Sequence, residues 1–245
     1  MRPMLFQWRG LTVWSYPAML YIGLVAGVVA GNAAAHAAGM DAFRAFVATL
    51  VLIVPALIGA RLLHVAAHWQ LYRQSLQQIW NRRDGGYAMY GGLPAALLLS
   101  VPLLAALQLP FGAFWDVAML TILVGMIFAR IGCLMNGCCA GRPSRSWLGV
   151  YLPNHRGVWD RRIPTQCLEA GWAGVLLVAA MTVWRWLPFP GALFLLAAAG
   201  YASGRLVLES LREPQPGATR FTIDHAISVV VIMLSLATFT ACWPK

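Results

Sequence analysis

The chain has 245 residues, of which 60% are hydrophobic and only 11% are charged, with a net charge of +10. Soluble globular domains carry about 25% charged residues, so this composition excludes an ordinary water-soluble domain. We expect the chain to work in a lipid bilayer, with no nucleic acid among its partners.

Apolar segments of about 20 residues, the length that crosses about 30 Å of hydrocarbon as a helix, recur along the chain. The predicted spans are residues 13–34, 45–68, 88–108, 112–130, 168–187, 191–209 and 223–242. Backbone groups in lipid must bond within their own segment, which favours helices over open sheet. The sequence therefore predicts an all-α polytopic membrane protein with about seven spans, forming one integral membrane domain over residues 1–245. A small hairpin is expected in the 142–167 connection, around "WLGVYLP".

The basic residues are distributed unevenly along the chain, and Lys245 is the only lysine among 18 of them. An arginine bias by itself also follows from a GC-rich genome. With seven spans, the N-terminus and the second, fourth and sixth connections share one side of the membrane. That side and its edge hold Arg2, Arg9, Arg73, Arg82, Arg83, Arg130, Arg142, Arg145, Arg156, Arg161, Arg162, Arg205, Arg212 and Arg220. The positive-inside rule would place it in the cytoplasm.

Several charged or polar residues fall within the spans or at their ends, where charge is expensive and by default indicates function. Arg205 and Glu209 are four residues apart on one helical face and can pair. Either this pair only locks helices together, or Arg205 and Arg130, two arginines near one membrane boundary, bind a phosphate, which the planar guanidinium contacts with two hydrogen bonds. Arg61 and His64, three residues apart, either line the cavity that would hold this phosphate-bearing ligand or only pack against neighbouring helices.

A glycine-rich segment, "RDGGYAMYGGLP" (83–94), leads into the third span. Glycines such as Gly91 and Gly92 let backbone amides approach a ligand closely, although a simple turn uses glycine as well.

The segment "IGCLMNGCCAG" (131–141) holds three of the five cysteines. One interpretation is a zinc site of Cys133, Cys138 and Cys139 with Cys167 or His155, although C-x4-C-C differs from common zinc patterns. A second is a disulfide from Cys167 to Cys138 or Cys139. A third is that small polarizable side chains fill a tight helix end. We expect neither a metal ion nor a cofactor.

Motifs in order along the chain resemble those of the bacterial prolipoprotein diacylglyceryl transferase family. "ARIGCLMNGCCAGR" (129–142) is similar to the family signature G-R-x-G-N-F-x-N-G-E-x-x-G, and "IPTQCLE" (163–169) to H-P-[ST]-Q-L-Y-E. "MYGGL" (89–93) resembles H-G-G-L, "GARLLHV" (59–65) resembles a G-x-R motif, and "SYPAMLYIG" (15–23) resembles W-Y-G-L-M-Y. "GYASGRLVLESLREP" (200–214) resembles G-x-x-R-x-x-x-E-x-x-R-x-P.

The resemblance implies transfer of a diacylglyceryl group from phosphatidylglycerol to the lipobox cysteine of a prolipoprotein signal peptide. It implies a multi-pass enzyme of the bacterial cytoplasmic (inner) membrane, with an extracytoplasmic active face in place of the positive-inside orientation. The catalytic residues it indicates are Arg130, Arg205, Tyr90 and Glu209. The substrate-binding residues it indicates are Tyr16, Arg61, Gly91, Gly92, Cys133, Asn136, Gly137, Cys138, Gly141, Gln166, Tyr201 and Arg212.

Four positions depart from the family pattern: Tyr90 and Ile163 replace histidines, Cys133 replaces an asparagine, and Cys138 replaces a glutamate. The two arginines would stabilise charge on the departing phosphate. Tyr90 would donate a hydrogen bond to substrate, because a phenol with a pKa near ~10 is a poor base. The alternatives are a paralogue that transfers a lipid group to another acceptor, and a non-catalytic membrane protein that binds phospholipid or lipoprotein.

Overall fold

The computed structural model describes residues 4–9, 11–67, 69–73, 89–154, 157–213 and 223–244. The long helices are α1 (Ser15–Ala37), α2 (Ala42–Ala67), α4 (Met89–Ala106), α5 (Phe111–Asn136), α6 (Thr165–Val183), α7 (Ala192–Ser210) and α8 (Ile223–Ala241). The short elements are α3 (Trp69–Tyr72), η3 (Trp184–Trp186), β1 (Met4–Trp8), β2 (Leu11–Trp14), β3 (Val150–Pro153) and β4 (Trp159–Arg162).

Six of the described helices are long and apolar enough to cross a membrane, and Gly91–Ala106 forms a shorter apolar helix. These seven helices correspond one to one with the predicted spans, so the prediction of an all-α polytopic membrane protein is confirmed. One boundary differs clearly: α5 continues to Asn136 instead of ending at residue 130. The prediction ended the span at the charge of Arg130, but Arg130 forms an ion pair with Glu169, and the helix continues past it.

The chain divides into two compact units, residues 35–114 and residues 1–34 with 115–245. In the smaller unit, α2 and α4 pack at a glycine contact. A Cβ added to either Gly59 or Gly91 would collide with the carbonyl oxygen of the other. Close backbone approach through small residues is a common way for helices to pack in lipid, where the hydrophobic effect does not drive helices together. The prediction of one integral domain stays a prediction.

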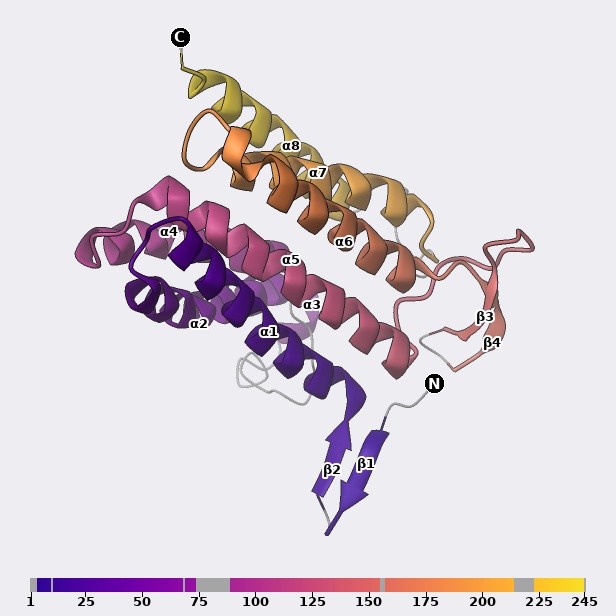
Figure 1. Ribbon diagram of the computed structural model, residues 1–245. Helices are drawn as coiled ribbons and strands as arrows, with labels where there is room; N and C mark the ends of the chain where they lie inside the picture. Colours follow the sequence, from indigo (N-terminus) through magenta and orange to yellow (C-terminus); the bar gives the residue numbers. More distant parts are fainter. Residues whose placement is uncertain are drawn as a thin grey trace. The chain divides into compact units, whose positions relative to one another are not determined.

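The larger unit contains α1, α5, α6, α7 and α8, with α6, α7 and α8 side by side (Figure 1). Its core joins α5, α6 and α7 through Met119, Leu120, Leu123, Ala173, Ala180, Leu193 and Ala197. A buried carboxylate holds one end of this bundle, because Asp116 accepts hydrogen bonds from the backbone N–H groups of Gly191 and Phe194, at 2.7 and 2.9 Å. It thereby satisfies two donors at the start of α7.

Two antiparallel hairpins accompany the helices. The pair β3 and β4 lies in the 142–167 connection, where the sequence predicts a hairpin, and this prediction is confirmed. Tyr151 and Trp159 stack on it, with ring centroids 5.5 Å apart, and both are exposed. The hairpin of β1 and β2 before α1 was not predicted.

Candidate active site

Three arginines converge on one carboxylate in the larger unit. Glu169 lies in the second turn of α6 and is only 2% exposed. Its oxygens pair with Arg130 of α5, with Arg205 of α7 at 2.9 Å, and with Arg212, just beyond α7, at 2.7 Å. The end of α5, the start of α6 and the end of α7 are therefore tied together by charge.

A second layer of carboxylates surrounds the arginines. Glu209 lies 3.1 Å from Arg205 and 3.5 Å from Arg212. Asp224, at the start of α8, lies 3.3 Å from Arg205, and its side chain is 39% exposed. The pairing of Arg205 with Glu209 that their spacing predicts is confirmed, but Arg205 also contacts two carboxylates on other helices.

The charge balance of this cluster leaves room for an anion. The three guanidiniums face two buried carboxylates, Glu169 and Glu209, which leaves one positive charge. Asp224 balances that charge from the edge of the cluster. Arg205 also keeps its buried Nε–H group without a hydrogen-bond acceptor among the described residues. A ligand with one negative charge and several acceptor oxygens suits this arrangement.

The segment after α5 turns back sharply. Gly137 has a φ of +74° and donates its N–H to Leu134, while Cys138 donates its N–H to the carbonyl oxygen of Cys133, at 3.2 and 3.1 Å. This pair of bonds is a Schellman motif, which favours glycine at the left-handed position. Asn136, the last residue of α5, is exposed. The local role of Gly137 is therefore to end the helix and redirect the chain.

Two side chains from the start of α6 hold the redirected chain. Gln166, which is 1% exposed, donates a hydrogen bond to the carbonyl oxygen of Cys138 at 2.6 Å, and Thr165 donates one to that of Cys139 at 2.7 Å. The backbone N–H of Gly141 bonds to the carbonyl oxygen of Ile163 at 2.9 Å. A Cβ at Gly141 would lie 2.8 Å from that oxygen and from the carbonyl oxygen of Leu211, so only glycine fits here.

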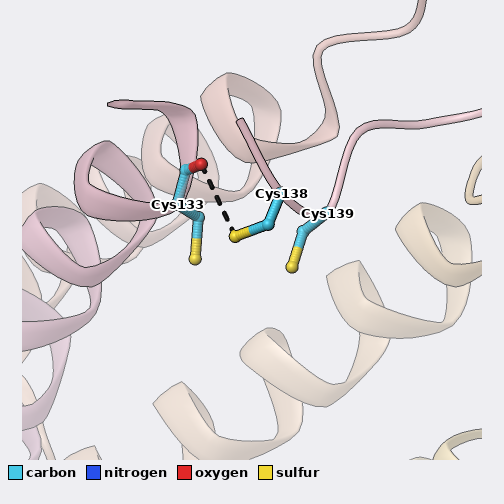
Figure 2. Close-up of side chains that lie close together, drawn as sticks. All are labelled: Cys133, Cys138 and Cys139. Atoms are coloured by element: carbon cyan, nitrogen blue, oxygen red, sulfur yellow. Dashed lines mark hydrogen bonds between the residues drawn. The ribbon is translucent and has the colours of Figure 1, made fainter. Parts of the chain in front are cut away.

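The thiols of Cys133, Cys138 and Cys139 form a cluster beside this turn (Figure 2), with their sulfur atoms all within 4.8 Å of one another. The Cys138 thiol donates to the carbonyl oxygen of Cys133 at 3.6 Å. Hydrogen bonds from the other two thiols and the positive charge of Arg212 and Arg130 lower the pKa of Cys139. All five cysteines are free thiols, and Cys167 is not part of the cluster.

Two predicted tyrosines border these groups. Tyr16, at the start of α1, packs its ring against Gly132, where an added Cβ would lie 3.3 Å from the ring atom Cδ2. It lies near the three cysteines and Arg130. Tyr201 of α7 is buried next to the Arg130 guanidinium. Both tyrosines therefore lie at the end of the bundle where the predicted motifs meet.

The other predicted residues belong to the smaller unit. Arg61 is 4% exposed, and its guanidinium lies over the ring of Tyr72, 5.4 Å from the centroid. Gly91 and Gly92 face α2, where a Cβ at Gly92 would lie 2.8 Å from the carbonyl oxygen of Ala56. The side chain of Tyr90 lies outside the described residues. The substrate roles of these four residues stay predictions.

Glu169 is the principal residue that the sequence analysis missed. It is the glutamate that ends "IPTQCLE", the segment similar to H-P-[ST]-Q-L-Y-E, so a signal was present. A carboxylate within the first turns of a predicted span should have been paired with the arginines of the other spans. Asp224, in the first turn of α8, was not among the predicted site residues either.

Comparison with known proteins bears directly on these motifs. The family model for prolipoprotein diacylglyceryl transferase matches residues 3–241. The chain belongs to this family. The resemblance stated from the motifs is thereby confirmed, and the cluster of Arg130, Glu169, Arg205 and Arg212 is formed by its motif segments.

Named relatives of the family cover most of the chain. A phosphatidylglycerol–prolipoprotein diacylglyceryl transferase of Clostridium tetani is 26% identical over 248 residues, covering 98% of this chain and 97% of the relative. A Bacillus cereus protein of the same name is 31% identical over 203 residues, covering 78% and 74%. One from Streptococcus pyogenes is 26% identical over 240 residues, covering 96% and 90%.

Proposed function

We propose that the protein is a diacylglyceryl transferase that moves the diacylglyceryl group of phosphatidylglycerol to the lipobox cysteine thiol of a prolipoprotein. The observation that carries the proposal is the convergence of Arg130, Arg205 and Arg212 on Glu169, in a chain whose family acts on these substrates. Family membership supports the reaction class, and the arginine cluster supports a phosphate-bearing lipid as the donor.

The reaction makes one bond and breaks one. The lipobox sulfur attacks the glyceryl carbon that carries the phosphate ester, forming a thioether, and the carbon–oxygen bond to phosphate breaks. Glycerol phosphate leaves with the electron pair of that bond, and the thiol proton is released. The phosphate passes from one negative charge towards two, so groups that stabilise developing negative charge accelerate the step.

The arginine cluster is suited to that demand. Glu169 holds the three guanidiniums close together before substrate arrives, which reduces the reorganisation needed during the reaction. The phosphodiester brings one negative charge, which can take the place of Asp224, the carboxylate that balances the third guanidinium from the edge of the cluster. Asp224 is the most exposed of the carboxylates bound to Arg205, so it is the group that the phosphate replaces most readily. Arg205 then offers its Nε–H as a further donor.

Two positions that depart from the family signature, Cys138 and Tyr90, change the groups available around the phosphate and the substrate. Cys138 takes the place of a family carboxylate, which removes one anion from the neighbourhood of the phosphate. Glu169 and Glu209 supply the carboxylates that order the arginines. We assign Tyr90, which stands where the family has a histidine, as a hydrogen-bond donor to the substrate, because a phenol is a poor base at neutral pH.

The arginine-rich end of the bundle is proposed to face the extracytoplasmic side of the bacterial inner membrane, where prolipoprotein signal peptides emerge. Trp147, Tyr151 and Trp159 are exposed in the 142–167 connection, and aromatic side chains are enriched at membrane interfaces. The nearby arginines would attract anionic headgroups such as that of phosphatidylglycerol.

The test is complementation in a bacterial strain depleted of its own transferase, with the modification of lipoproteins read by mass spectrometry. We expect the wild-type chain to add the diacylglyceryl mass to the lipobox cysteine, and Arg205→Ala to abolish it. Arg185→Ala is the matched control, since Arg185 is exposed at the opposite end of α6. Expression in the membrane without any lipoprotein modification would overturn the proposal and favour the non-catalytic lipid-binding alternative.

A further inference from the structure

The three-cysteine cluster has the composition of a soft-metal site. Cys133, Cys138 and Cys139 each offer one sulfur atom, and all three sulfurs lie within 4.8 Å of one another. Thiolates are soft ligands that favour ions such as Cu(I) and Zn²⁺ over the hard cations Mg²⁺ and Ca²⁺. The sulfurs need to move only slightly to bind one ion in common.

The backbone holds these sulfurs on one side of the turn. The Schellman motif at Gly137 reverses the chain, which places Cys138 beside Cys133 (Figure 2). Cys139 then adopts a φ of +64°, a left-handed conformation that is uncommon for a residue with a side chain. Thr165 and Gln166 fix the carbonyl groups of Cys139 and Cys138. These backbone contacts hold the segment that carries the three sulfur atoms in place.

The number of sulfur ligands favours Cu(I) over Zn²⁺. Within the described part of the chain, no fourth histidine, cysteine, aspartate or glutamate joins the group. Structural Zn²⁺ sites almost always have four ligands in a tetrahedron, whereas Cu(I) readily accepts three sulfurs in a plane. Arg130 and Arg212 supply positive charge close by, which offsets the net negative charge of three thiolates around a monovalent ion.

The three cysteines of the cluster differ in their exposure to solvent. Cys133 is buried, Cys138 is half-buried and Cys139 is exposed. An ion can therefore reach Cys139 first and then move inward to the other two sulfurs. A usable site requires such an entry path in addition to its ligands.

We propose that Cys133, Cys138 and Cys139 form a three-sulfur binding site for Cu(I). Each protonated thiol that joins the ion loses its proton to solvent, and no change of oxidation state is involved. Binding of the ion requires neither phosphatidylglycerol nor a prolipoprotein, so it can be measured independently of the proposed transfer reaction. Arg130 and Arg212 act electrostatically on Cys139, so an ion bound to the three sulfurs would lie close to the arginine cluster.

The experiment titrates Cu(I) into the full-length protein in lipid nanodiscs under anaerobic conditions, in competition with the chromophoric chelator bicinchoninate. We expect about one Cu(I) per chain, and X-ray absorption should show a copper ion with only sulfur ligands. Cys139→Ser should weaken binding by about 100-fold or more, since even the loss of an outer-shell partner costs about 10- to 100-fold. The double variant Cys167→Ser, Cys242→Ser is the matched control and should bind as the wild type does.

A second measurement uses the wild-type protein, so it does not depend on how the variants fold. Alkylation with N-ethylmaleimide is mapped by mass spectrometry with and without one equivalent of Cu(I). Copper should protect the three clustered cysteines and leave Cys167 and Cys242 reactive. Equal protection at all five cysteines, unchanged affinity in Cys139→Ser, or tight binding of Zn²⁺ with no binding of Cu(I) would each overturn the proposal. None of these outcomes depends on transferase activity.

Discussion

Arg212 and Glu169 lie 2.7 Å apart, although 43 residues separate them in the sequence. Arg130 and Arg205 bind the same carboxylate from two further places in the chain. The four side chains come from three different motif segments. Because all three arginines pair with Glu169, the arrangement of the arginines depends on this residue.

Glu169→Gln should destabilise the protein strongly. The substitution preserves the shape of the side chain but leaves three guanidiniums without their shared anion, and breaking a buried ion pair costs about 3–5 kcal/mol. Thermal unfolding in detergent micelles measures the effect. Asp41→Asn is the control, because it removes the charge of an exposed pair with Arg44 and preserves the capping oxygen at the start of α2. It should cost less than about 1 kcal/mol. Equal losses in the two variants would contradict the central role of Glu169.

Arg130→Ala and Arg205→Ala should each reduce diacylglyceryl transfer by about 100-fold or more, as expected for groups that stabilise charge in the transition state. Lysine should restore only part of the activity, because it lacks the planar pair of donors that matches a phosphate. Initial rates with phosphatidylglycerol and a lipobox peptide in nanodiscs provide the measurement, and Arg185→Ala should retain the wild-type rate. Normal turnover in both alanine variants would rule out the phosphate role.

Cys139 should react with iodoacetamide at a rate that depends less on pH, between pH 6 and 8, than the rate of a free thiol does. Only the thiolate reacts, and a thiol with a pKa near ~8.5 gains about tenfold in rate for each pH unit below that value. Since the neighbouring thiols and arginines lower the pKa of Cys139, a larger fraction of it is thiolate at pH 6 than of a free thiol, and its rate should rise less steeply with pH.

Mass spectrometry of the alkylated peptide gives the rate for Cys139, and a small reference thiol in the same tube gives the normal slope. Arg212→Gln removes one of the positive charges that lower the pKa, so the profile of Cys139 should become steeper. A tenfold rise per pH unit in the wild-type protein would show that the cluster does not hold a thiolate at Cys139.

A reporter cysteine at Arg145 should react with a membrane-impermeant maleimide in intact cells, in a background without the three exposed native cysteines. A reporter at Arg44 should react only after permeabilisation. This pattern follows if the arginine-rich end of the larger unit faces outward to anionic lipid instead of orienting the protein by the positive-inside rule. The reverse pattern would place that end in the cytoplasm.

The helical spans could be predicted from the sequence because their signal is local. Segment 13–34 contains no charged residue, and segment 223–242 is apolar after Asp224 and His225 at its start. A span-length apolar segment forms a helix in the bilayer whatever its neighbours are. The hairpin of β1 and β2 was missed because its nine strand residues carry no span-length signal and their pairing depends on a tight turn at Arg9, which has a φ of +47°. The boundary at Arg130 was misplaced because a charge ends a span only where it has no partner.

The sequence by itself determined that the chain is a polytopic helical membrane protein of the diacylglyceryl transferase family. Composition, the length of apolar segments and the order of the motifs can all be read without knowing the fold. Only the tertiary structure decided that Arg130, Arg205 and Arg212 share Glu169, and that Cys133 meets Cys138 and Cys139 at their sulfur atoms. The physical reason is that ion pairs and thiol contacts act over a few ångströms. Which groups come that close depends on how α5, α6 and α7 pack, and that packing is not encoded in any single segment.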